Sequence, residues 1–504
     1  MDGRTGRALA LLGAAVALGL AGEVLRTWVP ARLDVSLWVA VTLLTAYALI
    51  RGGALTAPPQ AEWLAAAVAA VFPCLLWRDS PTLFALDLMA IVGLLVLAAP
   101  ATAMRSLDRL GVSDLIRGGA WVGGSVLLGP IPLTIADIRL AELPVGARTR
   151  RLAAVAAGLV AAVPVLFLFG SLLSEADPLF GQSMASILAF DLRGFERHVI
   201  PAILMAWAAV GVLRGGFWRE GGVPTLPFEL TPRVPPATLL TFLGAIGGLF
   251  ALFVGFQARE LFLGPGEFQA LTGTTIAEYA RRGFFELVAV TALTLPMLLA
   301  ADWLLDRQGA AELRQFRRLT AAVLVLLALV LASAYSRMLL YRSYYGLTED
   351  RFYTLAFMTW LGVLLAWFAA TVLRGQRSRF VPGAVLAGLA ALLLLNFANP
   401  DAVVARVNLG RAVEGAPLDT AYLSRLSADA IPAIVEGATA LRVSERCLLL
   451  QQLETRWGAE LAMNGPASTW NFSRRAAIKR VGAAWQAARS CAPPVVGQGT
   501  DAKL

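Results

Sequence analysis

Long apolar stretches recur along the chain, and short polar segments rich in arginine separate them. Most of these stretches are long enough to cross a hydrocarbon core of about 30 Å as a helix. They are continuous and do not alternate in polarity, which favours helices over the strands of a membrane barrel. The pattern predicts an all-α, polytopic transmembrane bundle. Eleven spanning helices are expected at 8–25, 35–50, 61–77, 83–99, 151–173, 198–213, 237–257, 284–303, 319–341, 353–373 and 381–397.

The segment 115–136 is apolar but does not fit a continuous helix. Seven of its positions are glycine or proline, residues that weaken or break helices. If the segment does not cross, the cytoplasmic loops hold 20 arginines and the outer loops 11, as the positive-inside bias expects. We therefore predict a re-entrant or interfacial segment and a cytoplasmic N-terminus. A crossing segment, which would give twelve spans, is the alternative.

The last hundred or so residues differ from the rest, because they are polar, rich in arginine and helical in pattern. The sequence predicts a transmembrane domain at 1–397 and a soluble helical tail at 398–504, outside the inner membrane. Asp419 is the expected N-cap of a helix through Leu426, and a further helix is expected from Ser444 through Glu460.

Two of the three cysteines, Cys447 and Cys491, lie in this tail. Cysteines in an extracytoplasmic region often form disulfides, so a bond between these two is a candidate. Two free thiols are the alternative.

Composition agrees with a membrane protein and narrows its chemistry. The chain is 58% hydrophobic and 15% charged, against about 25% charged in soluble domains. Its net charge of +9 comes from arginines beside apolar stretches, so the lipid bilayer is the expected partner, with other envelope proteins as candidates. No nucleic-acid partner is expected, because no basic and aromatic module is present. One histidine, His198, cannot build a site of several histidines, and we predict no metal, cofactor or catalytic residue.

Polar residues near three predicted helix ends form a candidate cluster at the outer membrane surface. Ionisable residues in or beside spans are costly and point to a role. Glu286 paired with Arg337 would be the simplest way to tolerate both charges. The cluster could lock three helices and dock the tail, which we favour, or could form a catalytic site. Its members are Glu278, Arg281, Arg282, Glu286, Arg337, Tyr341, Asn396, Asn399 and Asp401.

Four short stretches resemble known families. They are Trp77–Pro81, Tyr279–Leu287, the stretch from Arg337 to Arg351, and Asn399-Pro400-Asp401 with Asn408. These stretches resemble the bacterial multi-pass membrane families filed as domains of unknown function 4153 and 4173, over about residues 70 to 435. The resemblance implies an inner-membrane protein with many helices and no assigned activity, so no catalytic residue is carried over.

Three functions stay open at this point. The favoured one is a non-enzymatic envelope, signalling or assembly component, because no recognisable catalytic set is present. A secondary transporter of a small solute or lipid is the second, and it would want broken helices in both halves. A membrane enzyme acting on envelope or lipid-linked substrates is the third, with Glu286 and Asp401 as the nearest candidates.

Overall fold

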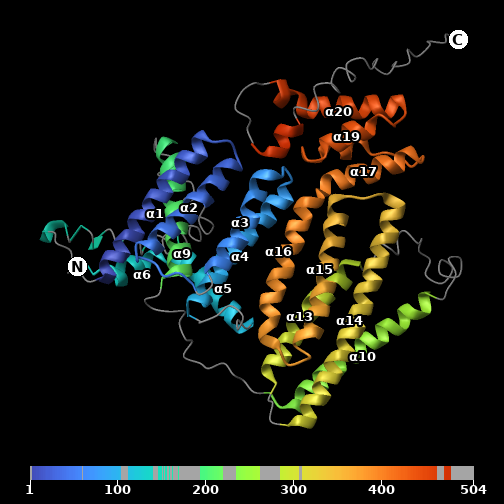
Figure 1. The fold of residues 1–504 in the computed structure, drawn as a ribbon, viewed down its shortest axis with the longest axis horizontal. Coiled ribbons are helices and arrows are strands. Elements are labelled where there is room, and N and C mark those ends of the chain that lie inside the picture. Colours follow the sequence, from blue (N-terminus) through green and yellow to red (C-terminus); the bar gives the residue numbers. More distant parts are fainter. Residues whose placement is uncertain are drawn as a thin grey trace.

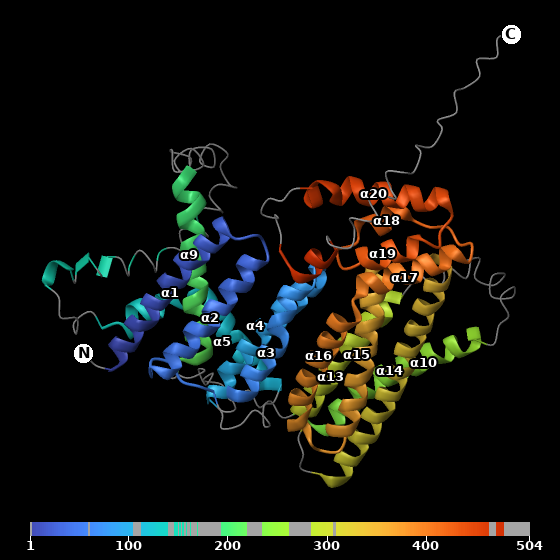
Figure 2. The ribbon, with the colours of Figure 1, turned by 45° about the horizontal axis from the view of Figure 1, so that its top comes forward.

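The computed structural model of the chain is built from helices (Figures 1 and 2). It describes residues 3–58, 61–103, 112–139, 146–149, isolated positions between 151 and 169, 193–218, 234–261, 284–305, 309–462 and 470–477. Within these ranges the regular elements are helical, apart from isolated bridges such as Val234 with Leu305. The all-α fold predicted from the apolar pattern is confirmed.

The helices form an N-terminal group, a C-terminal group and a layer across one end of the second group (Figure 2). The N-terminal group contains α1 (Gly3–Trp28), α2 (Leu33–Arg51), α3 (Ala61–Trp77), α4 (Pro81–Ala103), α5 (Val112–Leu128), α6 (Pro130–Pro132), the π-helical turn η2 (Leu133–Asp137) and α9 (Arg193–Phe217). The C-terminal group contains α10 (Pro236–Leu261), α13 (Phe284–Leu304), α14 (Ala310–Tyr345), α15 (Glu349–Thr371), the short η4 (Arg377–Arg379) and α16 (Phe380–Ala398).

Nine helices in the described part of the chain are long and apolar enough to cross a membrane. The shorter apolar helix α3 coincides with a tenth predicted span. The predicted multi-pass bundle is therefore confirmed, and nine of its predicted spans coincide with helices of this kind. The predicted span 151–173 lies almost wholly outside the described residues.

The predicted break in the segment 115–136 occurs at Gly129, where the chain bends by 65° between α5 and the following α6 and η2. Pro130 has no N–H to donate to the carbonyl of Val126, so the break leaves acceptors without helical partners. The indole of Trp207 on α9 donates to the carbonyls of Val126 and Leu127, at 3.0 and 3.1 Å. The bend is thus held by α9, and whether the segment crosses or re-enters stays a prediction.

Helix α16 joins the two groups, since it packs against both α15 and the pair α3 and α4. Trp77 at the end of α3 meets Phe397 near the end of α16 in an edge-to-face contact, with ring centroids 5.2 Å apart. The end of α3 and the end of α16 therefore lie together, on the side of the bundle where the chain enters the last helices.

We call the last helices, with residues 470–477, the cap. It contains α17 (Pro400–Val413), α18 (Thr420–Arg425), α19 (Ile431–Ala438) and α20 (Val443–Ala462), and it lies across the ends of α14, α15 and α16 (Figure 1). Its own apolar core includes Leu409, Leu423, Ile434, Leu449 and Leu453. The division of the chain at residue 397 stays a prediction.

Two local predictions in the cap are confirmed. The Asp419 carboxylate accepts a 2.8 Å hydrogen bond from the Tyr422 N–H, as an N-cap does, and α18 follows it. Helix α20, from Val443 to Ala462, contains the helix expected from Ser444 through Glu460.

Candidate functional site

Polar side chains from distant parts of the chain meet where the cap rests on the bundle. The turn between α3 and α4, the start of α15, the end of α16 and the turn before α19 all contribute. We call this group the cap site. Its members are Arg78, Asp79, Ser80, Glu349, Tyr353, Asn396, Asn399, Asp401, Ser427, Asp429, Asn471 and Arg474.

Two carboxylates in the cap site accept hydrogen bonds from backbone N–H groups in or next to each other's residue. Asp429 Oδ2 accepts from the N–H groups of Asp79 and Ser80, at 2.7 and 2.8 Å, just before α4 begins. Asp79 Oδ2 accepts from the Ala428 N–H at 2.9 Å, shortly before α19 begins. The first N–H groups of a helix lack partners within that helix, and a carboxylate there also suits the helix dipole. The exchange therefore ties the cap to the bundle at two helix starts.

Further donors complete the surroundings of Asp79. Its Oδ1 accepts from the Asn471 side-chain amide at 2.6 Å. The guanidinium groups of Arg32 and Arg474 lie 3.5 and 4.0 Å from the same oxygen. The Trp470 N–H donates to the Ala31 carbonyl at 3.4 Å, so the turn between α1 and α2 also contacts the cap.

Arg78 closes the carboxyl end of α16. Its Nε donates to the Asn396 carbonyl at 2.7 Å and one Nη to the Phe397 carbonyl at 3.5 Å, both of which lack helical partners. The guanidinium lies 4.2 Å from the centre of the Trp77 ring and 3.8 Å from Asp429 Oδ1. Burial lowers the pKa of Arg78, and Asp429 opposes that shift. An arginine remains charged under such a shift, so Arg78 supplies a fixed positive charge.

Asn396 connects the cap site to the interior of the bundle. Its side-chain amide donates to Asp87 Oδ1 on α4 at 2.9 Å and to the Leu392 carbonyl at 3.1 Å. Asn396 and Asp87 are both completely buried. A buried polar pair costs stability unless it is hydrogen-bonded, so this contact fixes α16 against α4.

Asn399 and Asp401 begin α17. Asn399 has a left-handed backbone, with φ of 55°, and its side chain accepts from the Ala402 N–H at 3.2 Å as an N-cap. The Asn399 amide also donates to the Asp429 carbonyl at 3.2 Å. Asp401 is completely buried, and the Ser427 hydroxyl donates to its Oδ2.

Burial governs the ionisation of these acids. Desolvation raises the pKa of Asp401, and the hydrogen bond from Ser427 opposes the shift. Desolvation also raises the pKa of Asp429, against the hydrogen bond from Ser473 and the bond from the Ser80 backbone. The hydrogen-bond donors therefore offset only part of the free energy that desolvation of these two carboxylates costs.

The structure brings together three of the nine residues of the predicted cluster, Asn396, Asn399 and Asp401. Glu278, Arg281 and Arg282 lie outside the described residues. Glu286 is exposed in the first turn of α13.

Two further members of the predicted cluster lie on α14, outside the cap site. Arg337 is half-buried there, and its ion pair with Glu286 stays a prediction. Tyr341 packs on the ring of Tyr345, with centroids 4.9 Å apart, and lies under the guanidinium of Arg351. It is part of an aromatic contact where α14 meets α15.

The cysteines leave one prediction open. Cys447 lies on α20 and Cys491 lies outside the described residues, so their disulfide stays a prediction. Cys74 is a free, buried thiol on α3. Burial in an apolar helix makes it an inert packing residue.

Sequence reasoning did not assign Arg78, Asp79, Ser80, Asp429 and Asn471 to a site. A usable signal existed for the first three, because Trp77–Pro81 is one of the stretches that carry the family resemblance. Asp429 had no such signal, since it is one acid among many in a polar tail. Its partner Asp79 lies 350 residues earlier in the chain.

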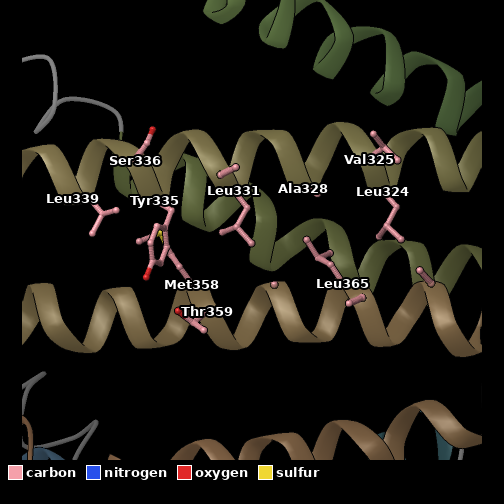
Figure 3. A pocket seen from close by; sticks show the side chains of 14 residues that line it. Leu324, Val325, Ala328, Leu331, Tyr335, Ser336, Leu339, Met358, Thr359 and Leu365 are labelled. Carbon is pink, nitrogen blue, oxygen red and sulfur yellow. The ribbon is translucent and has the colours of Figure 1, made fainter. Parts of the chain in front are cut away.

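Two grooves in the described part of the chain lie away from the cap site, and both are apolar. One, of about 680 Å³, runs between α14 and α15, where Leu331 and Tyr335 face Met358 and Leu365 (Figure 3). The other, of about 460 Å³, lies among α2, α3 and α4. Neither groove is lined by a residue of the cap site.

No group of three or more metal-ligating side chains occurs in the described part of the chain. Four oxygens of the cap-site aspartates accept from backbone or side-chain donors, whereas Asp401 Oδ1 and Asp429 Oδ1 are buried without a hydrogen-bond donor among the described residues. The arrangement can therefore hold the cap and the bundle in a defined orientation. It is a packed contact, whereas a ligand site is an open pocket lined by a few polar groups.

Comparison with known proteins gives one result. The family model described as "Domain of unknown function (DUF4153)" matches residues 63–437. The match starts at α3 and ends within α19, so it contains the cap site except for Asn471 and Arg474. It confirms the first of the two predicted resemblances, and the second stays a prediction. Neither the curated proteins nor the solved structures gave a match.

Proposed function

The chain belongs to the family described as domain of unknown function (DUF4153), and we propose that it is a non-enzymatic component of the inner membrane. In this proposal the bundle is an anchor, and the cap is held over one end of it to bind another envelope protein. The family and the many apolar helices make the chain an integral membrane protein.

One observation carries the proposal, the exchange of backbone hydrogen bonds between Asp79 and Asp429. Buried carboxylates are costly unless their oxygens are satisfied. Here the oxygens bind backbone N–H groups in the segments just before α4 and α19, each in the opposite part of the molecule, so their binding energy orients the cap. A catalytic carboxylate would instead face a cleft that a substrate can enter.

We place the cap on the extracytoplasmic side. The arginine distribution predicts that the connections 26–34, 78–82 and 342–352 lie outside. Residues of all three connections contact the cap. The Ala31 carbonyl accepts from the Trp470 N–H at 3.4 Å, Arg78 lies 3.8 Å from Asp429 Oδ1, and the Leu347 N–H donates to the Asn408 side chain at 3.0 Å. Agreement among three independent connections supports this orientation.

The test is complementation in a strain that lacks the gene. Wild type, Asp429→Ala and Asp419→Ala are produced at equal levels in the membrane, with a photo-crosslinking residue at the exposed Thr455 of α20. We expect Asp429→Ala to lose both growth under envelope stress and a discrete cross-linked protein. Asp419→Ala, which removes an N-cap on the cap surface, keeps both.

Full complementation by Asp429→Ala with a displaced cap would contradict the proposal. So would an envelope lipid or glycan that changes in the deletion strain and is restored by the wild type but not by Asp401→Asn with a docked cap. The second result would assign the site to catalysis.

A transporter is the second candidate, and one observation favours it. The bend at Gly129 is followed by the buried Asp137, which the guanidinium groups of Arg4 and Arg214 hold at 2.6 and 3.0 Å. Broken helices beside buried charges are typical of transporters. Ion- or solute-dependent flux in proteoliposomes that Asp137→Asn abolishes would favour this function over the anchor.

A further inference from the structure

The cap site contains more acids than bases among its described residues. The carboxyl groups are those of Asp79, Glu349, Asp401 and Asp429, and the guanidinium groups are those of Arg78 and Arg474 with the neighbouring Arg32. Each guanidinium lies within 4.0 Å of Asp79 or Asp429. Three bases can balance three carboxylates, so a fourth carboxylate would leave a net negative charge in a buried place.

The two remaining acids contact each other. The side chain of Glu349 at the start of α15 lies within hydrogen-bonding reach of the side chain of Asp401 at the start of α17. Two carboxylates cannot form a hydrogen bond with each other, because neither has a hydrogen to donate. Asp401 Oδ1 is buried and has no donor among the described residues if both acids are ionised. A proton on Glu349 would supply that donor.

We propose that the docked cap contains a proton-binding site, in which Glu349 and Asp401 share one proton between α15 and α17. This inference rests on the proposed function, because it adds a regulator to the same contact. The bond that forms on docking is O–H···O between the two carboxyl groups, and the proton comes from water on the side of the cap. The shared proton also brings the charge of the four acids and three bases to zero.

Several charged or titratable groups surround the pair. The α15 residues are Asp350 and Tyr353, the cap residues are Tyr422, Asp429 and Arg474, and the turns between helices supply Arg32, Arg78 and Asp79. Their acids repel a second negative charge on the pair, and their arginines are already beside Asp79 and Asp429. The environment therefore favours the singly protonated pair.

The direction of the pH effect follows from linkage. In the undocked state both acids face water and ionise near their ordinary values, whereas the docked state retains a proton. Burial raises the pKa of Asp401 in the docked state. The contribution to docking is thus complete below the ordinary pKa of the acid and is lost as pH rises through the raised value. The cap binds most firmly in acid and loosens as the compartment becomes alkaline.

The experiment measures cap position against pH in the full-length chain in lipid nanodiscs. Spin labels on noncanonical residues at the exposed positions Thr455 and Arg374 report the distance from the cap to the far end of α15. Between pH 5 and 9 we expect the undocked-to-docked ratio of the wild type to rise by up to about tenfold per pH unit, as release of one proton requires.

Two variants separate the proton site from other titrations. In Glu349→Gln a neutral amide can donate permanently to Asp401, so the cap stays docked and the slope disappears. Asp350→Asn changes an exposed neighbouring acid and keeps the slope. A wild type without a slope, or a Glu349→Gln variant with the wild-type slope, would overturn the proton site.

Failure of the proposed function gives a different result in the same measurement. Asp429→Ala should undock at every pH. If it undocks while the wild type shows no slope, the anchoring function stands and the proton site is wrong. If Asp429→Ala remains docked, the anchoring role of the cap site is wrong.

Discussion

Two buried carboxylate centres in this membrane protein differ in the groups that bind their oxygens. In the N-terminal group, each oxygen of Asp137 has its own arginine, with Arg4 at 2.6 Å and Arg214 at 3.0 Å. In the cap site, the carboxylates bind mainly backbone N–H groups, hydroxyl groups and each other. The first centre is neutralised by fixed charges, so it can hold α1, η2 and α9 at any ordinary pH. The second depends on a proton.

The comparison explains why the two centres suit different tasks. Arginine retains its charge under all physiological conditions, and its bonds to a carboxylate are permanent. A carboxyl pair changes its bonds with pH. The N-terminal centre therefore joins helices within the bundle, and the cap site joins the bundle to a part that can respond to its surroundings.

The largest effect is expected for Asp137→Ala. The change leaves the guanidinium groups of Arg4 and Arg214 without their shared carboxylate, and the loss of one partner of a buried ion pair costs about 3–5 kcal/mol. Unfolding of the purified chain in mixed micelles, followed by tryptophan fluorescence, gives the cost. The loss in the free energy of unfolding should be the same at pH 6 and pH 8. A clear pH dependence would contradict the proposed difference between the two centres.

Asp429→Ala should have an effect of comparable size, and it should be confined to the cap. The variant loses two hydrogen bonds to the backbone of Asp79 and Ser80, and bonds to a charged group contribute about 1.5–3 kcal/mol each. Limited proteolysis should cut the cap faster and leave the N-terminal group unchanged. Equal sensitivity of both parts would show that they unfold together.

Gly211→Ala tests the packing that holds the bend near Asp137. A Cβ at Gly211 would lie 2.3 Å from the Cα of Val126 on α5, so α5 and α9 must separate, at about 1–3 kcal/mol. Gly248→Ala on α10 is the matched control, because nothing lies within 4 Å of its added Cβ. The same micelle unfolding should show a loss for the first variant only. Equal behaviour of the two would mean that this close contact does not hold α5.

Asp419→Ala should have the smallest effect. It removes the N-cap of α18 on the exposed side of the cap, which costs about 1 kcal/mol. Hydrogen exchange should increase in α18 while the cap site remains protected. A loss of protection at Ser80 would show that the cap surface and the cap site are coupled, which the account does not expect.

The sequence was most informative where the determining interactions are local. Ten predicted spans coincide with helices because apolar length is a property of each stretch alone. The break at Gly129 and the N-cap at Asp419 were also visible, since glycine, proline and a capping acid act on neighbouring residues.

The cap site was only partly visible in the sequence. Asn396, Asn399 and Asp401 stood out because they are polar residues at the end of a span. Asp79 and Asp429 could not be paired from the sequence, since 350 residues separate them and neither has a distinctive local pattern. The expected pair of Glu286 with Arg337 stays a prediction. The helices α13 and α14 that carry them pack against each other.

The most direct test of the account is the distance distribution between labels at Thr455 and Arg374 at pH 6, in wild type and in Asp429→Ala. We expect one narrow distribution in the wild type and a broad one, displaced to other distances, in the variant. An unchanged narrow distribution in Asp429→Ala would contradict the claim that the exchange between Asp79 and Asp429 holds the cap on the bundle.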